Sequence, residues 1–286
     1  MSELALGTVQ FGLAYGIAGR SQPVDEAEAS RILAFAHEVG IRRLDTAPVY
    51  GDIETRLRRL CGDHRFDIVS KIPPVPSNAE GEAIGSFVRQ AIGSSQRALG
   101  DALVGMIFHN EADTAGTRGA TAWAAAVDAT TATGLACGVS RYAPAGPQGA
   151  QPAAGEMLQC PGNALNQRLP NCPEAALVPE ISLRSAFLQG LLLMPLDAAK
   201  ARVPAASAAL DRWALWCADR AVSPLVGALS VVKGVEEVSY CLVGVDDLHQ
   251  LQAIVRAWNE AMPVKAPDLA CDDPQVIDPR HWKTQS

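Results

Sequence analysis

The feature that most constrains this chain is a regular alternation of short apolar runs with longer amphipathic segments. The apolar runs predict eight strands, at Leu4–Gly7, Arg42–Thr46, Asp67–Lys71, Leu103–Phe108, Leu135–Ser140, Met157–Pro161, Ile181–Ser185 and Tyr240–Val245. Each run is apolar on both sides, which is typical of parallel strands covered on both faces. The sequence therefore predicts a parallel sheet with helices packed against it.

The segments between these runs carry helix signals. They predict helices at Asp25–Val39, Glu54–Leu60, Gly81–Leu99, Thr121–Thr133 and Ala208–Cys217, and two more that start near Ser223 and Asp246. Asp25 and Glu28 can form a capping box at the start of the first helix, and Pro224 follows Ser223 as a favoured first helical residue. Eight strand-helix units without a central topological switch favour an α/β protein of the (β/α)8 TIM barrel type.

Two connections lack a helix pattern. The segment APAGPQGAQPAAGE, residues 143–156, is a poor helix, so we expect a short or distorted turn there, and residues 165–180 predict a loose connection. The string GLAYGIAG, residues 12–19, has no helix pattern directly after it. It therefore gives little support to a Rossmann dinucleotide-binding sheet.

The bulk properties limit the function classes. A length of 286 residues fits one barrel domain, with a core of about residues 4–258 and a tail of 259–286, and 48% hydrophobic residues can bury a large core. A net charge of -7 offers no basic stripe for nucleic acid or anionic lipid, and no apolar run is long enough to span a membrane. Seven scattered cysteines without a CxxC pair indicate reduced thiols and no metal site. We expect a cytoplasmic protein that acts on a small molecule and needs no obligate protein partner.

Four polar residues close or follow the apolar runs. Asp45, Tyr50, Lys71 and His109 would all face the mouth of a barrel, where barrel enzymes hold their active sites. Each has an ordinary structural interpretation: a cap, a core aromatic, a surface charge and a strand-end histidine. Together they suggest general acid catalysis. Tyr50 would donate a proton, Lys71 would lower its pKa, Asp45 would keep Lys71 protonated, and His109 would orient a substrate carbonyl. Such chemistry needs an external hydride donor.

These residues lie in strings that resemble the aldo-keto reductase family, over nearly all of residues 4–258. The matching strings are GTVQFG from Gly7, LDTAPVYG from Leu44 to Gly51, VSK ending at Lys71 and IFHN around His109. The resemblance implies a bacterial oxidoreductase that reduces an aldehyde or ketone with NAD(P)H, with Asp45, Tyr50, Lys71 and His109 as its catalytic residues.

The resemblance also implies a set of cofactor-binding residues: Gly7, Thr8, Asp45, Ser140, Gln159, Arg184, Ser185, Phe187, Leu188, Gly190, Gly244, Val245 and Gln250. Two positions depart from the family pattern. Arg141 stands where the family has an asparagine, and Arg184 stands where a tyrosine commonly stacks on the nicotinamide. The last predicted helix offers its N-terminus to a phosphate. However, Asp246 and Asp247 in its first turn would repel a 2'-phosphate, so NADPH is the family default and NADH stays open.

Two other functions remain open on the sequence. A strand-end lysine such as Lys71 can form a Schiff base with a sugar aldehyde, as in a barrel lyase or aldolase. The departures at Arg141 and Arg184 leave room for a non-catalytic nucleotide sensor. The substrate and the oligomeric state stay undetermined by the sequence.

Overall fold

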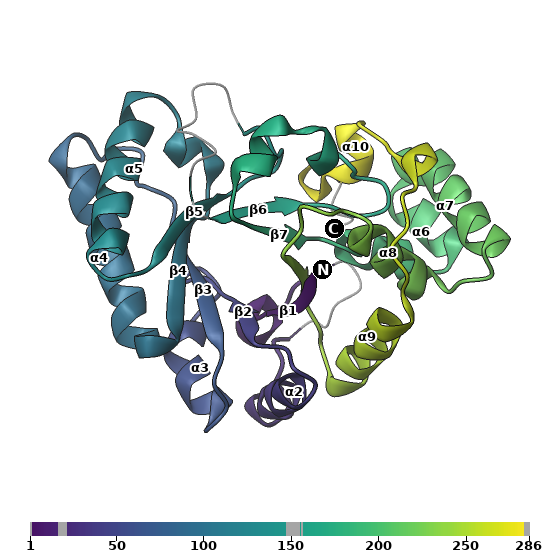
Figure 1. The fold of residues 1–286 in the computed structure, drawn as a ribbon, viewed down its shortest axis with the longest axis horizontal. Coiled ribbons are helices and arrows are strands. Elements are labelled where there is room, and N and C mark those ends of the chain that lie inside the picture. Colours follow the sequence, from purple (N-terminus) through teal and green to yellow (C-terminus); the bar gives the residue numbers. More distant parts are fainter. Residues whose placement is uncertain (1, 17–21, 147–154, 156, 283–286) are drawn as a thin grey trace.

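Eight parallel strands form a closed barrel in the computed structural model, which describes residues 2–16, 22–146, 155 and 157–282. The strands follow chain order around the barrel (Figure 1): β1 (Glu3–Gly7), β2 (Arg43–Asp45), β3 (Asp67–Ile72), β4 (Leu103–Phe108), β5 (Ala136–Ser140), β6 (Met157–Pro161), β7 (Glu180–Arg184) and β8 (Tyr240–Val243). The predicted (β/α)8 barrel is therefore confirmed.

Helices surround the strands (Figure 1): α1 (Val9–Gly12), α2 (Glu26–Glu38), α3 (Ile53–Cys61), α4 (Glu82–Leu99), α5 (Gly116–Thr131), α6 (Leu196–Arg202), α7 (Ser207–Asp219), α8 (Pro224–Lys233), α9 (Leu248–Glu260) and α10 (Pro274–Ile277). Neighbouring helices pack in order from α2 to α5, and α9 packs against both α8 and α2. The helical layer therefore joins the beginning of the chain to its end.

The barrel closes where β1 pairs with β8, with Leu4 opposite Cys241. Between β5 and β6 the backbones approach closely at Gly138. A Cβ atom there would lie 2.0 Å from the carbonyl oxygen of Met157. Only glycine fits this position, because a side chain would push the two strands apart.

The cap of α2 differs in part from the predicted capping box. Asp25 accepts a hydrogen bond from the Glu28 amide at 2.9 Å, as expected for an N-cap. The Glu28 carboxylate does not return to Asp25. It accepts instead from the amide of Leu248 at 2.7 Å and pairs with Arg31. Glu28 thus links α2 to the first turn of α9 rather than completing a local box.

Several boundaries and short elements differ from the sequence prediction. Helix α5 begins at Gly116 rather than Thr121, and β8 ends at Val243 rather than Val245. Helices α1, α6 and α10 were not predicted, and each has only four to seven residues. Helices this short are marginal alone, so tertiary contacts rather than local signals hold them. In α10, Val276 and Ile277 are buried against Leu165 and other residues of a second apolar cluster, which keeps this part of the tail on the barrel.

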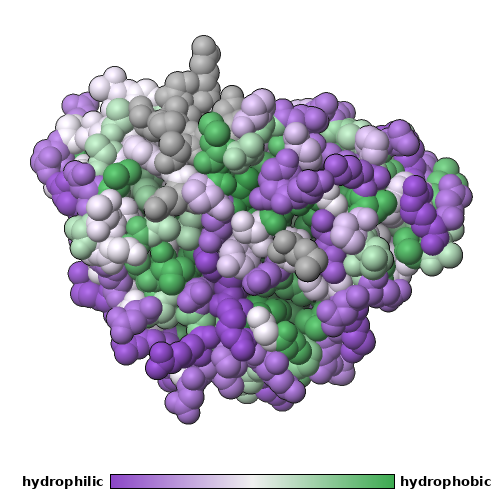
Figure 2. All heavy atoms as spheres, viewed as in Figure 1, coloured by the Kyte–Doolittle hydropathy of each residue, from purple (hydrophilic) through white to green (hydrophobic). Residues whose placement is uncertain are grey.

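The two connections without a helix pattern have different outcomes. Most of the predicted turn at 143–156 lies outside the described residues. The connection at 165–180 holds two short 3-10 turns, Leu169–Asn171 and Pro173–Leu177. None of the seven cysteines, all of which lie in the described part of the chain, forms a disulfide bond. Hydrophilic residues are spread around the outline of the face in Figure 2, with hydrophobic residues in smaller groups between them.

Among the described residues, no single helix is long and apolar enough to cross a membrane. The segments Pro204–Asp219 and Pro224–Lys233 pass that test only as a pair bent by 94°.

Candidate active site

The structure brings the four predicted polar residues together at the carboxyl ends of β2 to β4. Asp45 ends β2, Lys71 lies near the end of β3, His109 follows β4, and Tyr50 comes from the loop after β2. Lys71 Nζ lies 5.3 Å from the centre of the Tyr50 ring, and the His109 ring meets the Tyr50 ring edge to face at 5.9 Å. No described residue forms a hydrogen bond with the Tyr50 hydroxyl. The phenol is therefore held between a cation and an imidazole.

A buried ion pair fixes Asp45 and Lys71. The Lys71 amine donates to Asp45 Oδ2 at 2.6 Å and to the carbonyl oxygen of Thr46 at 2.9 Å, and its side chain is 1% exposed. The other carboxylate oxygen of Asp45 accepts from Gln159 Nε2 at 2.7 Å. The Ser140 hydroxyl donates to Gln159 Oε1 at 3.4 Å. A polar chain thus runs from β5 through β6 and β2 to the lysine of β3.

Burial controls the protonation of these groups. It lowers the pKa of Lys71, although the Asp45 carboxylate opposes this. Burial, and then the positive charge of Lys71, lower the pKa of His109 to about 4, so its imidazole is neutral at pH 7. The pKa of Tyr50 is raised, first by burial and then by the Asp45 charge. The sequence predicts that Lys71 lowers this pKa, but burial and the Asp45 charge outweigh the positive charge of Arg184, and the phenol keeps its proton.

A cavity of about 570 Å³ opens beside Asp45 and Tyr50 and extends to the start of α9. Of the predicted cofactor-binding residues, nine line it: Gly7, Asp45, Gln159, Arg184, Ser185, Phe187, Gly190, Gly244 and Gln250. The other four, Thr8, Ser140, Leu188 and Val245, are buried and do not line it. Lys71 and His109 are not among its lining residues, but they contact two that are: Lys71 pairs with Asp45, and the His109 ring meets the Tyr50 ring.

The cavity wall also contains residues that the sequence did not single out. Gln10, Tyr15, Leu225 and Ile254 are examples. Gln10 lies inside the GTVQFG string, three residues after Gly7, so the string itself pointed to it. The others come from a loop and from the outer helices α8 and α9, where nothing local marks a residue as facing a cavity.

The loop after β7 is strained. Ser185, Leu188 and Gln189 adopt positive φ angles of 62°, 49° and 54°, a region that side chains disfavour. Asn163 supports the loop by donating to the carbonyl oxygen of Ser185 at 3.1 Å. Such strain persists only where surrounding contacts fix the backbone, and it is common at ligand-binding loops.

The first turn of α9 is already occupied by the protein's own acceptors. Glu28 accepts from the Leu248 amide, and Asp247 accepts from the Gln250 amide at 2.9 Å. The side-chain oxygen of Gln250 accepts from the Asp246 amide at 2.9 Å. The phosphate site predicted at this helix end therefore has fewer free amides than expected and three carboxylates beside it. Both features disfavour a further negative charge.

The fold and site together define a (β/α)8-barrel protein with a polar cluster and a long cavity at the carboxyl ends of its strands, as barrel enzymes have. The model of the Aldo/keto reductase family matches residues 3–110, a segment that contains Asp45, Tyr50, Lys71 and His109. The match covers less than half of the chain, so it shows that residues 3–110 resemble the aldo-keto reductase family within a closed barrel.

Solved structures share the fold. A Pseudomonas aeruginosa protein assigned to the aldo-keto reductases is 24% identical with a TM-score of 0.62, covering 90% of this chain and 89% of its own. The aldo-keto reductase AKR11C1 from Bacillus halodurans, in its holo form, is 18% identical with a TM-score of 0.65, covering 98% of this chain and 95% of its own. At these identities the likeness shows the fold alone. No curated protein matches the chain.

Proposed function

We propose that this chain reduces an aldehyde or ketone to an alcohol with NAD(P)H, in one barrel domain whose tail packs on its surface. The observation that carries the proposal is the placement of Tyr50 between Lys71 and His109 at the edge of a cavity large enough for a nicotinamide. The first-strand residue Gly7 and the β6 residue Gln159 line the same cavity, next to Asp45.

The residues present fit a nicotinamide dinucleotide. Gln159 would meet the nicotinamide end, the strained loop at Ser185–Gly190 would follow the pyrophosphate, and Gly244 and Gln250 would meet the adenosine end. All of these positions except Leu188 line the same cavity of about 570 Å³. When bound, the dinucleotide supplies the hydride that no side chain can supply.

The side chains supply the proton and its control. Tyr50 keeps its proton at neutral pH and can give it to a carbonyl oxygen as negative charge develops there. The neutral imidazole of His109 can orient that oxygen by a hydrogen bond. Lys71, held by Asp45, places a positive charge next to the phenolate that remains.

The Schiff-base alternative fits the structure less well. A lysine that attacks an aldehyde must reach it as a free amine. The Lys71 side chain is 1% exposed, donates to Asp45 and to the backbone of Thr46, and is not among the residues that line the cavity. The sensor alternative differs from the proposal in a single measurable property, which is turnover.

The test is the replacement Tyr50→Phe, with Tyr240→Phe as its matched control. Tyr240 lies at the start of β8, at the opposite end of the barrel, near Arg43. General acid catalysis contributes about 10²- to 10⁴-fold, so Tyr50→Phe should lower kcat by that factor while the Kd for NAD(P)H stays unchanged. Tyr240→Phe should keep kcat. Equal turnover by Tyr50→Phe and the parent chain would defeat the proposal, and cofactor binding without turnover by the parent chain would indicate a sensor.

A further inference from the structure

Arg184 introduces a second positive charge into the cavity. It is the last residue of β7 and lines the cavity together with Asp45, Tyr50 and Gln159. Its charge acts on Tyr50, Lys71 and His109, which places it at the end of the cavity where the reaction is proposed. The side chain is half-buried, so water screens it only in part.

No carboxylate of the described residues neutralises Arg184. Asp45 is committed to Lys71 and Gln159 by both of its oxygens. Asp246 lines the far end of the cavity, beside α9. The one hydrogen bond that the Arg184 side chain forms with the described residues goes to the carbonyl oxygen of Arg141 at 3.2 Å, which uses one of five N–H donors. The part of the cavity where the reaction is proposed therefore carries an excess positive charge, and the Arg184 guanidinium has N–H groups left to bind a ligand.

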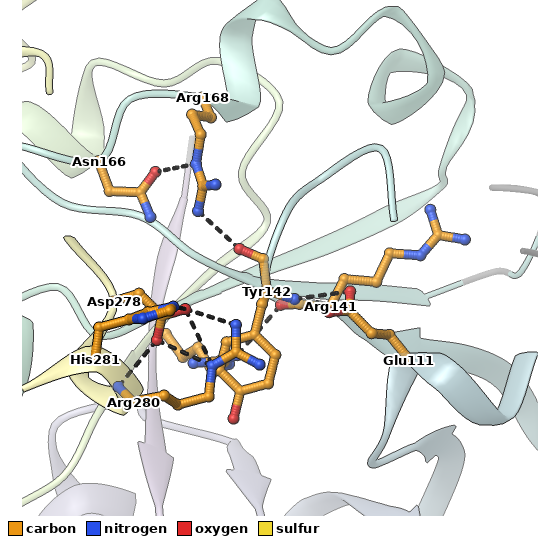
Figure 3. A network of polar contacts seen from close by, with 9 residues as sticks. Glu111, Arg141, Tyr142, Asn166, Arg168, Asp278, Arg280 and His281 are labelled. Carbon is orange, nitrogen blue, oxygen red and sulfur yellow. Dashed lines mark hydrogen bonds and ion pairs between the residues drawn. The ribbon is translucent and has the colours of Figure 1, made fainter. Parts of the chain in front are cut away.

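The guanidinium of Arg184 is held in position by an aromatic ring. It lies 4.7 Å from the centre of the Tyr142 ring. The guanidinium of Arg280, from the tail, lies over the same ring (Figure 3), at 3.3 Å from its centre. Unlike Arg184, Arg280 forms an ion pair with the carboxylate of Asp278. The two arginines share one aromatic partner, and of the two only Arg184 has no counter-ion in the part of the chain that the structure describes.

We propose that Arg184 binds an anionic group of the substrate, so that the preferred substrates are carbonyl compounds that carry a carboxylate. A carboxylate accepts two parallel N–H bonds from a guanidinium, and this geometry suits an arginine whose guanidinium already lies over an aromatic ring. The ion pair would hold the carbonyl beside the Tyr50 hydroxyl. This inference rests on the proposed function, which it extends by naming the class of substrate.

The test uses probes that differ only in charge. Binding of benzoate and benzamide to the full chain, measured by calorimetry, reads the anion preference without any turnover. The reduction of 4-carboxybenzaldehyde and 4-formylbenzamide then gives a ratio of kcat/KM values. Hydrogen bonds to charged groups imply roughly a 10- to 100-fold preference for the anionic member of each pair.

Three variants assign the preference to one side chain. Arg184→Gln should remove most of it, and Arg184→Lys should keep part of it because the charge remains. Arg280→Gln removes the neutralised arginine on the same ring and should leave the preference as it is. Equal preferences in the parent chain and Arg184→Gln would overturn the inference. So would a loss of NAD(P)H affinity in Arg184→Gln as large as its loss of benzoate affinity, because Arg184 would then serve the cofactor.

The outcomes separate this inference from the proposed function. A benzoate preference that depends on Arg184, with neither aldehyde reduced, supports the anion site and defeats the reductase. Reduction of both aldehydes at equal kcat/KM, with benzoate and benzamide bound equally, supports the reductase and defeats the anion site.

Discussion

The ion pair between Lys71 and Asp45 should make the stability of this barrel depend on pH when the carboxylate is removed. In Asp45→Asn the shape of the side chain is kept, but the amine of Lys71 loses the carboxylate that contacts it at 2.6 Å. The buried amine still donates to Thr46, and Glu54 is the remaining carboxyl group whose charge acts on it. Because burial already lowers the pKa of Lys71, the variant lysine should lose its proton in the folded state.

The size of the loss in stability is set by the free energy of removing the proton from Lys71 when the chain folds. An unfolded lysine has a pKa of about 10.4, and each pKa unit corresponds to about 1.4 kcal/mol. Folding with a neutral lysine at pH 7 therefore costs at most about 4.6 kcal/mol. The unfolded chain then binds more protons than the folded chain, so stability rises with pH until the unfolded lysine also titrates. At pH 9 the same cost should fall to about 2 kcal/mol.

Denaturant unfolding at pH 7 and pH 9 measures this difference. Asp211→Asn is the matched control, because Asp211 pairs with Lys200 on the surface and its side chain is 50% exposed. Loss of a surface pair should cost less than about 1 kcal/mol at either pH. The reasoning is wrong if Asp45→Asn loses the same free energy of unfolding at both pH values, or if it loses no more than the control.

Three further outcomes are expected. In Gly12→Ala, the new Cβ would lie 1.7 Å from the carbonyl oxygen of Tyr50, so the free energy of unfolding should fall by about 1 to 3 kcal/mol and kcat should also fall. The control Gly93→Ala, in α4, should raise the free energy of unfolding by up to about 1 kcal/mol. The imidazole of His109 should titrate by NMR with a pKa of about 4, and a value near 6.5 would contradict its burial. Calorimetry should show NADH bound about tenfold more tightly than NADPH, because three carboxylates surround the first turn of α9, and a preference for NADPH would refute this.

The sequence predicted the barrel because the signal for each strand is local. Runs such as Leu103–Phe108 are apolar, short and bounded by polar residues, and this pattern does not depend on distant parts of the chain. The meeting of Asp45, Tyr50, Lys71 and His109 was predictable for a related reason, since the carboxyl ends of parallel strands converge at one mouth.

Features that depend on distant contacts could not be predicted. The sequence predicts that Glu28 forms a capping box with Asp25, yet its carboxylate accepts a hydrogen bond from the amide of Leu248, 220 residues away. The stack of Arg184 and Arg280 on Tyr142 joins β7 to the tail, and no spacing rule connects these positions. The sign of the Tyr50 pKa shift was also missed, because it depends on how deeply the phenol is buried.

The seam between β1 and β8 has a consequence for how the chain is made. Leu4 is synthesised well before its partner Cys241, because more than 200 residues separate the two in the chain. Until then one side of β1 has backbone groups with no neighbouring strand, and such an open margin invites pairing with other chains. One edge of β1 therefore stays unpaired until the ribosome has synthesised β8.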